Sequence, residues 1–203
     1  MKKLLLILFI SLGFIGSANA NSIEGAFGYK FGQVVKNTEF RIVQDTLISS
    51  KYFKPARPLP YFSKYYLSTT LSDKKIFEIQ AWHSDDSSSS NSCELDNGDF
   101  PKILKMLEAK YGDFEEIINT SDYGYNADGK PWFINKIEFR YTKNNRNIYL
   151  RCNRNSNWKY RLSIYYVDKK LSNLYISENK KWQKQEALKE KIKALEEASE
   201  YDL

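Results

Sequence analysis

Three consecutive segments in the second half of the chain alternate between apolar and other side chains with a period of two. They span residues 132–142, 146–153 and 160–167. Successive side chains of a strand point to opposite faces, so every second residue can share one buried face. The spacing therefore predicts a three-stranded antiparallel meander with a single core face, made by Ile137, Phe139, Tyr141, Ile148, Leu150, Cys152, Tyr160, Leu162, Ile164 and Tyr166.

Further strands are expected on either side of the chain's middle. Residues 114–120 can pair with 132–142 across the turn residues 126–129. Residues 61–71 and 75–82 flank the turn Ser72-Asp73-Lys74 and predict a hairpin, with Phe77, Ile79 and Ala81 on its buried face. A short strand is expected near 40–43, and the proline-rich stretch 54–60 indicates an extended connector.

Two helices are expected. Residues 99–111 carry an apolar stripe of helical period, with Asp99 as the expected cap and Gly112 after the last turn. The tail, from about 177 to 199, is charged and has a narrow apolar seam at Leu188, Ile192 and Leu195. The tail helix either docks on its own domain or projects to a partner, including a second copy of the chain.

The order of these elements predicts an α+β fold: an antiparallel sheet, built from the hairpin and the meander, with one packed helix and a C-terminal helix. We expect residues 21–176 to form the domain and 177–203 the tail helix.

Residues 1–20 have the pattern of a secretory signal peptide. Lys2 and Lys3 precede a short apolar run, and Ala18-Asn19-Ala20 fits a cleavage site, which predicts removal after Ala20. The alternative is a membrane anchor, but the run is shorter than the roughly 20 residues that span a bilayer. The sequence thus predicts a periplasmic or secreted protein with no transmembrane span in the mature chain.

Cys93 and Cys152 are the only cysteines of the chain. In an oxidising compartment an even pair indicates a disulfide. We expect it to join the entry of the helix at 99–111 to the inner face of the meander.

Two local motifs occur together: Gly25-Ala26-Phe27-Gly28 with Phe31-Gly32 at the start, and Leu107-Glu108-Ala109-Lys110-Tyr111-Gly112 at the helix end. In this combination the chain resembles a loose class of small exported bacterial proteins, most of them uncharacterised. The resemblance implies a periplasmic or secreted α+β domain over about residues 23–168, and it transfers no catalytic residues.

The sequence offers little for catalysis. His83 is the sole histidine, and no nucleophile elbow, phosphate-binding loop or dinucleotide fingerprint is present. Residues 124–135 lack the carboxylates that a calcium-binding EF-hand loop needs at its ends. We expect no enzymatic activity, no cofactor and no metal.

Basic side chains concentrate between residues 136 and 161, where Glu138 is the only acid. The alternation places five candidate binding residues on the face opposite the core: Arg140, Tyr149, Arg151, Arg161 and Tyr165. Arginine beside tyrosine can hold anionic groups by paired hydrogen bonds and ring stacking. The alternative is an ordinary solvated sheet face, or one that the tail helix covers.

The sequence therefore predicts an exported, non-enzymatic binding protein of the bacterial envelope. Its expected partner is an envelope protein or an anionic polymer, with nucleic acid disfavoured. The alternative is a secreted or periplasmic inhibitor of a hydrolase, acting through the polar stretch 84–91.

Overall fold

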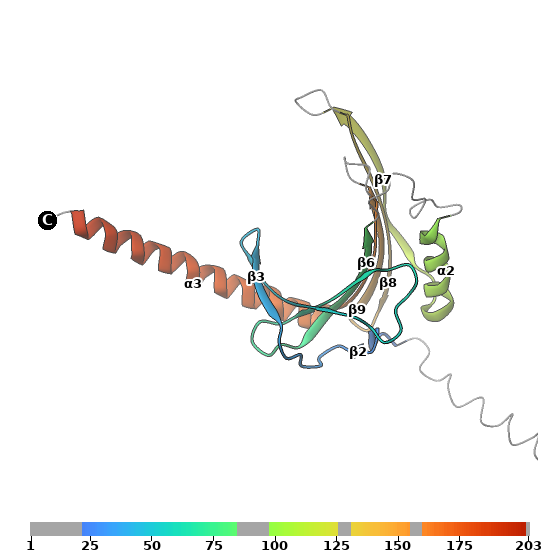
Figure 1. The fold of residues 1–203 in the computed structure, drawn as a ribbon, viewed down its shortest axis with the longest axis horizontal. Helices are drawn as coiled ribbons and strands as arrows, with labels where there is room; N and C mark the ends of the chain where they lie inside the picture. Colours follow the sequence, from blue (N-terminus) through green and yellow to red (C-terminus); the bar gives the residue numbers. More distant parts are fainter. Residues whose placement is uncertain (1–21, 85–97, 126–130, 155–159, 202–203) are drawn as a thin grey trace, which may run out of the picture.

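The sheet of the computed structural model is antiparallel throughout and strongly curved (Figure 1). The structure describes residues 22–84, 98–125, 131–154 and 160–201. Eight strands follow the order β3-β4-β5-β6-β10-β9-β8-β7, and β1 pairs with β2 in a separate ribbon. The strands are β1 (Gly25–Ala26), β2 (Tyr29–Lys30), β3 (Glu39–Val43), β4 (Thr46–Phe53), β5 (Lys64–Thr69), β6 (Ile76–Ser84), β7 (Glu115–Tyr125), β8 (Pro131–Lys143), β9 (Arg146–Arg154) and β10 (Tyr160–Asp168).

With α2 (Asp99–Tyr111) and α3 (Lys169–Tyr201), these strands make an α+β fold, so the predicted fold class is confirmed. In the view of Figure 1, α2 lies beside the sheet on one side and α3 extends away on the other. The meander is joined to the hairpin by direct pairing of β10 with β6, where Ile164 lies opposite Ala81.

The core lies between the sheet and α2. The predicted inner positions of β8, β9 and β10 belong to the core cluster or pack against it, and the side chain of Tyr160 lies outside the described residues. From α2, the stripe of Phe100, Ile103, Leu107 and Tyr111 is buried against them. The period of two in the strands and the helical period in α2 therefore predicted the two surfaces that pack against each other in the core.

A glycine flanks α2 at each end, and the C-terminal end depends on it. Gly112 has φ 108° and ψ −174°, a backbone conformation that side chains rarely allow, and its N–H donates to the Glu108 carbonyl (2.9 Å). The expected cap is wrong: Gly98 occupies the cap position, and Asp99 lies in the first turn, where Lys102 Nζ is 3.2 Å from its carboxylate. Asp99 there still complements the positive end of the helix dipole.

The N-terminal third contains a strand that the sequence analysis missed. The strand expected at 40–43 is β3, and it forms a hairpin with the unpredicted β4. Gln44 and Asp45 make the turn, both with positive φ (48° and 57°). The Ser49 hydroxyl, buried in β4, is bonded to the hydroxyls of Thr38 (3.1 Å) and Thr69 (2.7 Å).

The β5–β6 turn is located as predicted, but Phe77 is not on the core face. The register shifts between Ser68 and Thr69, so that Ser68 pairs with Glu78 and Thr69 with Ile76. Phe77 is the additional residue at this bulge. Its ring stacks on Tyr175 of α3 with centroids 4.7 Å apart.

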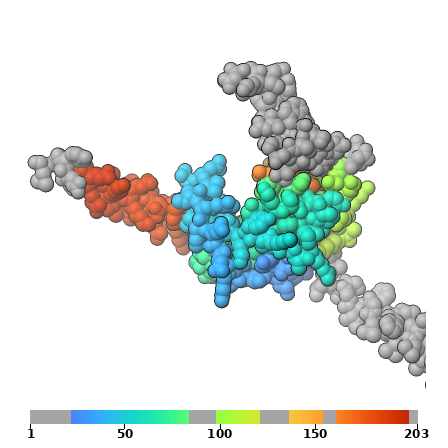
Figure 2. Space-filling model, viewed as in Figure 1, coloured from blue at the N-terminus to red at the C-terminus, as the bar shows by residue number. Residues whose placement is uncertain are grey.

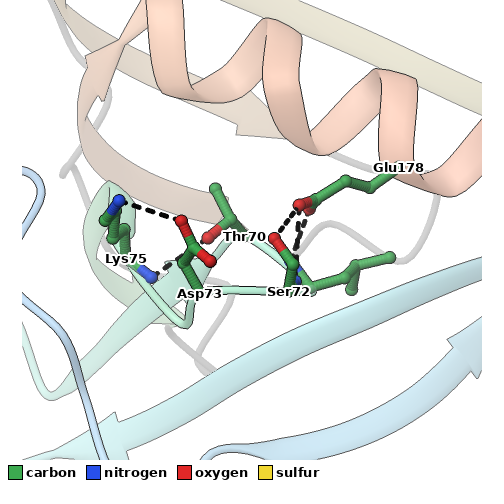
Figure 3. Close-up of polar contacts among 6 residues, drawn as sticks. Thr70, Ser72, Asp73, Lys75 and Glu178 are labelled. Atoms are coloured by element: carbon green, nitrogen blue, oxygen red, sulfur yellow. Dashed lines mark hydrogen bonds and ion pairs between the residues drawn. The ribbon is translucent and has the colours of Figure 1, made fainter.

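The C-terminal helix begins at Lys169, earlier than the expected residue 177, and follows β10 without a break. The Asp168 carboxylate accepts the Leu171 N–H (3.1 Å) and so caps the first turn. Further along, Glu178 binds the β5–β6 turn (Figure 3): its carboxylate accepts the N–H groups of Leu71 (2.6 Å) and Ser72 (3.3 Å).

The tail helix docks on its own domain over part of its length and projects over the rest, and whether a partner binds it stays a prediction. The first half of α3 docks on β4, β6 and β10. Glu186 and Glu190 then line a hollow beside the β3–β4 hairpin, and the C-terminal end of the helix stands clear of the rest of the described molecule (Figure 2). In the outer half the seam residues Leu188, Ile192 and Leu195 are exposed (59%, 46% and 71%). Neither described helix has the length and apolar composition needed to cross a membrane.

The predicted disulfide falls partly outside the described residues, because Cys93 is not among them. Cys152 is 1% exposed on the inner face of β9, as predicted, and the described part of the chain holds no free cysteine. The pairing of Cys93 with Cys152 stays a prediction. The predicted signal peptide also lies outside the described residues.

Candidate binding face on the sheet

The sheet face opposite the core, here called the outer face, is organised in rows that run across the strands. One row contains Glu138, Arg151, Ser163, Trp82 and Lys64, which are direct neighbours on β8, β9, β10, β6 and β5. The next row contains Arg140, Tyr149, Tyr165, Gln80, Tyr66 and Tyr52. Cross-strand neighbours are close enough to contact each other, so each row is a continuous line of contacts.

All five predicted binding residues lie on this outer face. Arg140, Tyr149 and Tyr165 share one row, Arg151 lies in the adjacent row, and Arg161 lies opposite Asn153 in a third. The alternation therefore placed them on a common face, but their electrostatic surroundings differ from one another.

Arg151 is held in place by a carboxylate and two rings. Its Nε donates to Glu138 (2.6 Å), a residue only 4% exposed. Its guanidinium lies over Tyr149 and Tyr165, 5.0 and 4.7 Å from the ring centroids. Glu138 therefore neutralises the charge of Arg151, and the two rings fix its orientation.

Arg140 is paired in a similar way. Its Nη2 donates to Glu115 of β7 (2.9 Å), and this hydrogen bond raises the pKa of Arg140. Arg140 and Arg151 thus each have a carboxylate partner, and Glu138 is shared between Arg151 and Lys136.

Arg161 lies in a different setting, above the ring of Trp82. Its guanidinium is 4.8 Å from the ring centroid, and Lys64 Nζ is 4.5 Å from the same ring. Tyr66 stacks beside Trp82 (6.2 Å), and Tyr52 meets Tyr66 edge to face (5.3 Å). The described ion pairs of the outer face, Lys136–Glu138, Arg140–Glu115 and Arg151–Glu138, include neither Lys64 nor Arg161.

We call Trp82, Lys64, Arg161, Tyr66 and Tyr52 the Trp82 cluster. Sequence reasoning found only Arg161 among them. The signal for Trp82 was present, because it continues the outward alternation of Glu78 and Gln80 in β6. Lys64 and the tyrosines could be assigned to the cluster only from the β5–β6 register, which places Lys64 opposite Trp82.

Buried polar atoms without partners also occur on this face. Ser163 Oγ and Asn153 Oδ1 have no hydrogen-bond partner in the described part of the chain. Buried polar groups are ordinarily paired. These two atoms lie beneath the surface of the outer face near Trp82 and Arg161.

Arg146, another basic residue of this stretch, has a structural role. It donates to the Ile23 carbonyl (2.8 Å) and to Asp168 (3.2 Å), and so joins the start of the described chain to the β10–α3 junction. Some basic residues of this stretch therefore stabilise the fold, and only the others can contribute to a binding surface.

The described residues show little that resembles a catalytic or metal centre. His83 Nδ1 lies 3.3 Å from Ser63 Oγ, and within the described residues no carboxylate is bonded to its ring. No cluster of three metal-ligating side chains occurs in the searched residues. No family model matches the chain, and no curated protein is significantly similar to it.

Proposed function

We propose that the chain is an exported, non-enzymatic binding protein of the bacterial envelope that holds an anionic polymer on the outer face of its sheet. The observation that supports this is the Trp82 cluster, where Lys64 and Arg161 lie over one ring and outside the described ion pairs of the face. Two such cations beside the half-buried rings of Trp82 and Tyr66 and the exposed ring of Tyr52 suit a polymer that carries both acidic groups and rings, such as an acidic glycan.

Arg140, Arg151, Tyr149 and Tyr165 support the site in this proposal. The ion pairs of Arg140 with Glu115 and of Arg151 with Glu138 hold the neighbouring rows in place. In this proposal, anions are contacted chiefly at Arg161 and Lys64. This refines the expectation from sequence, in which the arginines were equivalent.

The test compares binding of the protein to immobilised alginate, an acidic glycan, and to neutral dextran over a range of salt concentrations. Binding to the acidic glycan should weaken steeply with salt, because contacts to a polyanion release counterions. The double variant Lys64→Gln/Arg161→Gln should bind more weakly and with a shallower salt dependence.

The matched control removes two exposed charges from α3, in the variant Lys180→Gln/Lys184→Gln. If this variant loses as much affinity as the Lys64/Arg161 variant, only net charge matters and the proposed site is wrong. Equal binding of dextran would also contradict it.

Export is part of the same proposal. Processing after Ala20 leaves Ile23, a buried core residue, two residues inside the new N-terminus of the mature protein. Expression of the full chain in a bacterium, followed by mass measurement of the periplasmic fraction, should give the shortened chain. Recovery of the uncleaved chain from the cytoplasm would contradict export.

The outer half of α3 favours a second role in association. Leu188, Ile192 and Leu195 are exposed at helical spacing, and such a stripe can pair with another helix, including that of a second copy. Sedimentation equilibrium should show a concentration-dependent dimer that Leu188→Ser/Ile192→Ser abolishes. The hydrolase-inhibitor alternative depends on the stretch 84–91, most of which lies outside the described residues.

A further inference from the structure

An apolar cavity of about 260 Å³ lies on the other side of the sheet from the Trp82 cluster. Four parts of the chain enclose it: the β1–β2 ribbon, the connector after β4, one side of α2 and the inner face of β10. Its walls include Phe27, Leu59, Ile103, Leu107, Tyr111 and Tyr166. Met106, which is 47% exposed, marks the side open to solvent.

The walls are fixed by contacts with the sheet. The Tyr65 hydroxyl accepts the Leu59 N–H (3.0 Å) and lies 3.2 Å from the Leu59 carbonyl, which anchors the connector. The Phe27 ring meets Tyr65 and Tyr166 edge to face, at 5.1 and 5.9 Å. Such contacts make the cavity a preformed feature of the fold.

The charges at the cavity are of one sign. Arg57 and Lys110 both line it, both are exposed, and no carboxylate is among its lining residues. Neither cation takes part in an ion pair of the described chain. Among the lining residues, burial raises the pKa of Tyr166 well above its usual value, so its hydroxyl stays neutral.

We propose that this cavity binds a single-chain fatty acid, with the alkyl tail among the apolar walls and the carboxylate at Arg57 and Lys110. The tail gains by leaving water, and the two cations select an anionic head. The volume lies just below the range of about 300–1,000 Å³ that suits drug-sized ligands, which favours one thin chain over a ring system or a two-chain lipid. This inference does not depend on the proposed function of the outer face.

Calorimetric titration with hexanoate, octanoate, decanoate, laurate and myristate, each below its micelle concentration, tests the proposal. Affinity should rise by about fourfold per methylene group while the tail still finds apolar wall, and then level off. The alcohol of the same length should bind more weakly than the acid. Affinity that is independent of chain length, or no saturable binding, would overturn the proposal.

Variants on α2 and on the connector after β4 test the contacts of the carboxylate separately from those of the alkyl tail. Arg57→Gln/Lys110→Gln should weaken laurate binding by roughly tenfold or more, since contacts to a charged group are among the stronger hydrogen bonds, and should leave dodecanol unaffected. Lys105→Gln, an exposed position on α2 outside the cavity lining, is the matched control. Equal laurate affinity of the double variant and this control would overturn the role of the two cations.

A third variant guards against a general loss of structure. Met106→Trp places a larger ring at the cavity mouth, at a position 47% exposed, and should block laurate and dodecanol alike. Its unfolding temperature should remain that of the wild type. A folded Met106→Trp protein that binds laurate normally would show that the tail lies elsewhere.

Discussion

The side-chain amide of Asn179 in α3 makes two hydrogen bonds to the backbone of Leu47 in β4. Its Oδ1 accepts the Leu47 N–H and its Nδ2 donates to the Leu47 carbonyl, both at 2.9 Å. The pairing of β4 with β5 begins only at Ser50, so Leu47 has no strand neighbour on that side. Asn179 takes the place of the missing strand, and the Tyr175 hydroxyl donates to the same carbonyl (3.1 Å).

We therefore expect Asn179→Ala to destabilise the fold by about 1–3 kcal/mol, because it leaves two part-buried backbone groups with fewer partners. Chemical denaturation measures the change. Asn179→Asp should destabilise the fold at least as much, since it loses the donor and places a carboxylate oxygen against the Leu47 carbonyl at a position only 6% exposed. Lys180→Ala, at the exposed neighbouring position, should change stability little; an equal loss there would contradict the assignment.

Gly112→Ala should destabilise the protein by about 1–3 kcal/mol. The backbone of Gly112 lies in a region that only glycine occupies without strain. The added methyl group meets Tyr141 at 3.6 Å, an ordinary contact, so the cost is conformational. Thermal unfolding beside Asp113→Ala, an exposed neighbour, measures it; a Gly112→Ala protein as stable as that control would contradict the strain.

The parts of the fold that sequence predicted are those whose pattern is local and strict. In β8, β9 and β10 an unbroken alternation fixes both the strands and their buried face. In α2 the apolar stripe and Gly112 fix the helix and its end. In these segments the local sequence pattern and the tertiary packing favour the same structure, so the pattern alone was enough to predict it.

The parts that sequence missed depend on partners far along the chain. In β4, Ser49 and Ser50 interrupt the alternation and are buried side by side; Ser49 is accommodated by Thr38 and Thr69. Phe77 leaves the core face because of a bulge, which alternation cannot reveal. The early start of the last helix depends on Asp168, which caps it and also pairs with Arg146.

The candidate binding face was also predictable from the sequence only in part. Alternation predicted that the five outward residues share a face, but not which arginines are neutralised. That depends on register, which places Glu138 opposite Arg151 and Glu115 opposite Arg140. The Trp82 cluster depends on the pairing of β6 with both β5 and β10, two contacts that no local pattern encodes.

Protein purified from the bacterial periplasm should contain a disulfide between Cys93 and Cys152. Its intact mass should be two hydrogens lighter than that of the reduced chain, and iodoacetamide should not label it. Closing a loop of this length contributes about 4 kcal/mol in the chain-entropy account, so Cys93→Ser should lower stability by about 2–5 kcal/mol. Labelling of both thiols in the native, unreduced protein would contradict the pairing.

Glu78→Gln should stabilise the protein at neutral pH. Burial raises the pKa of Glu78 above its ordinary value of 4.5, although the Ser68 hydrogen bond (3.0 Å) and the charge of Arg151 oppose this shift. The folded state then holds a proton that the unfolded state releases, so stability is lost as the pH rises from about 4.5 through the folded pKa. The glutamine variant avoids this loss.

The unfolding temperature of Glu78→Gln should therefore exceed that of the wild type at pH 7, and the difference should vanish below about pH 4.5. The control Glu186→Gln, on the outer part of α3, should show no such pH-dependent gain. A Glu78→Gln protein that is less stable than wild type at pH 7 would mean that the charged carboxylate stabilises the fold through Arg151.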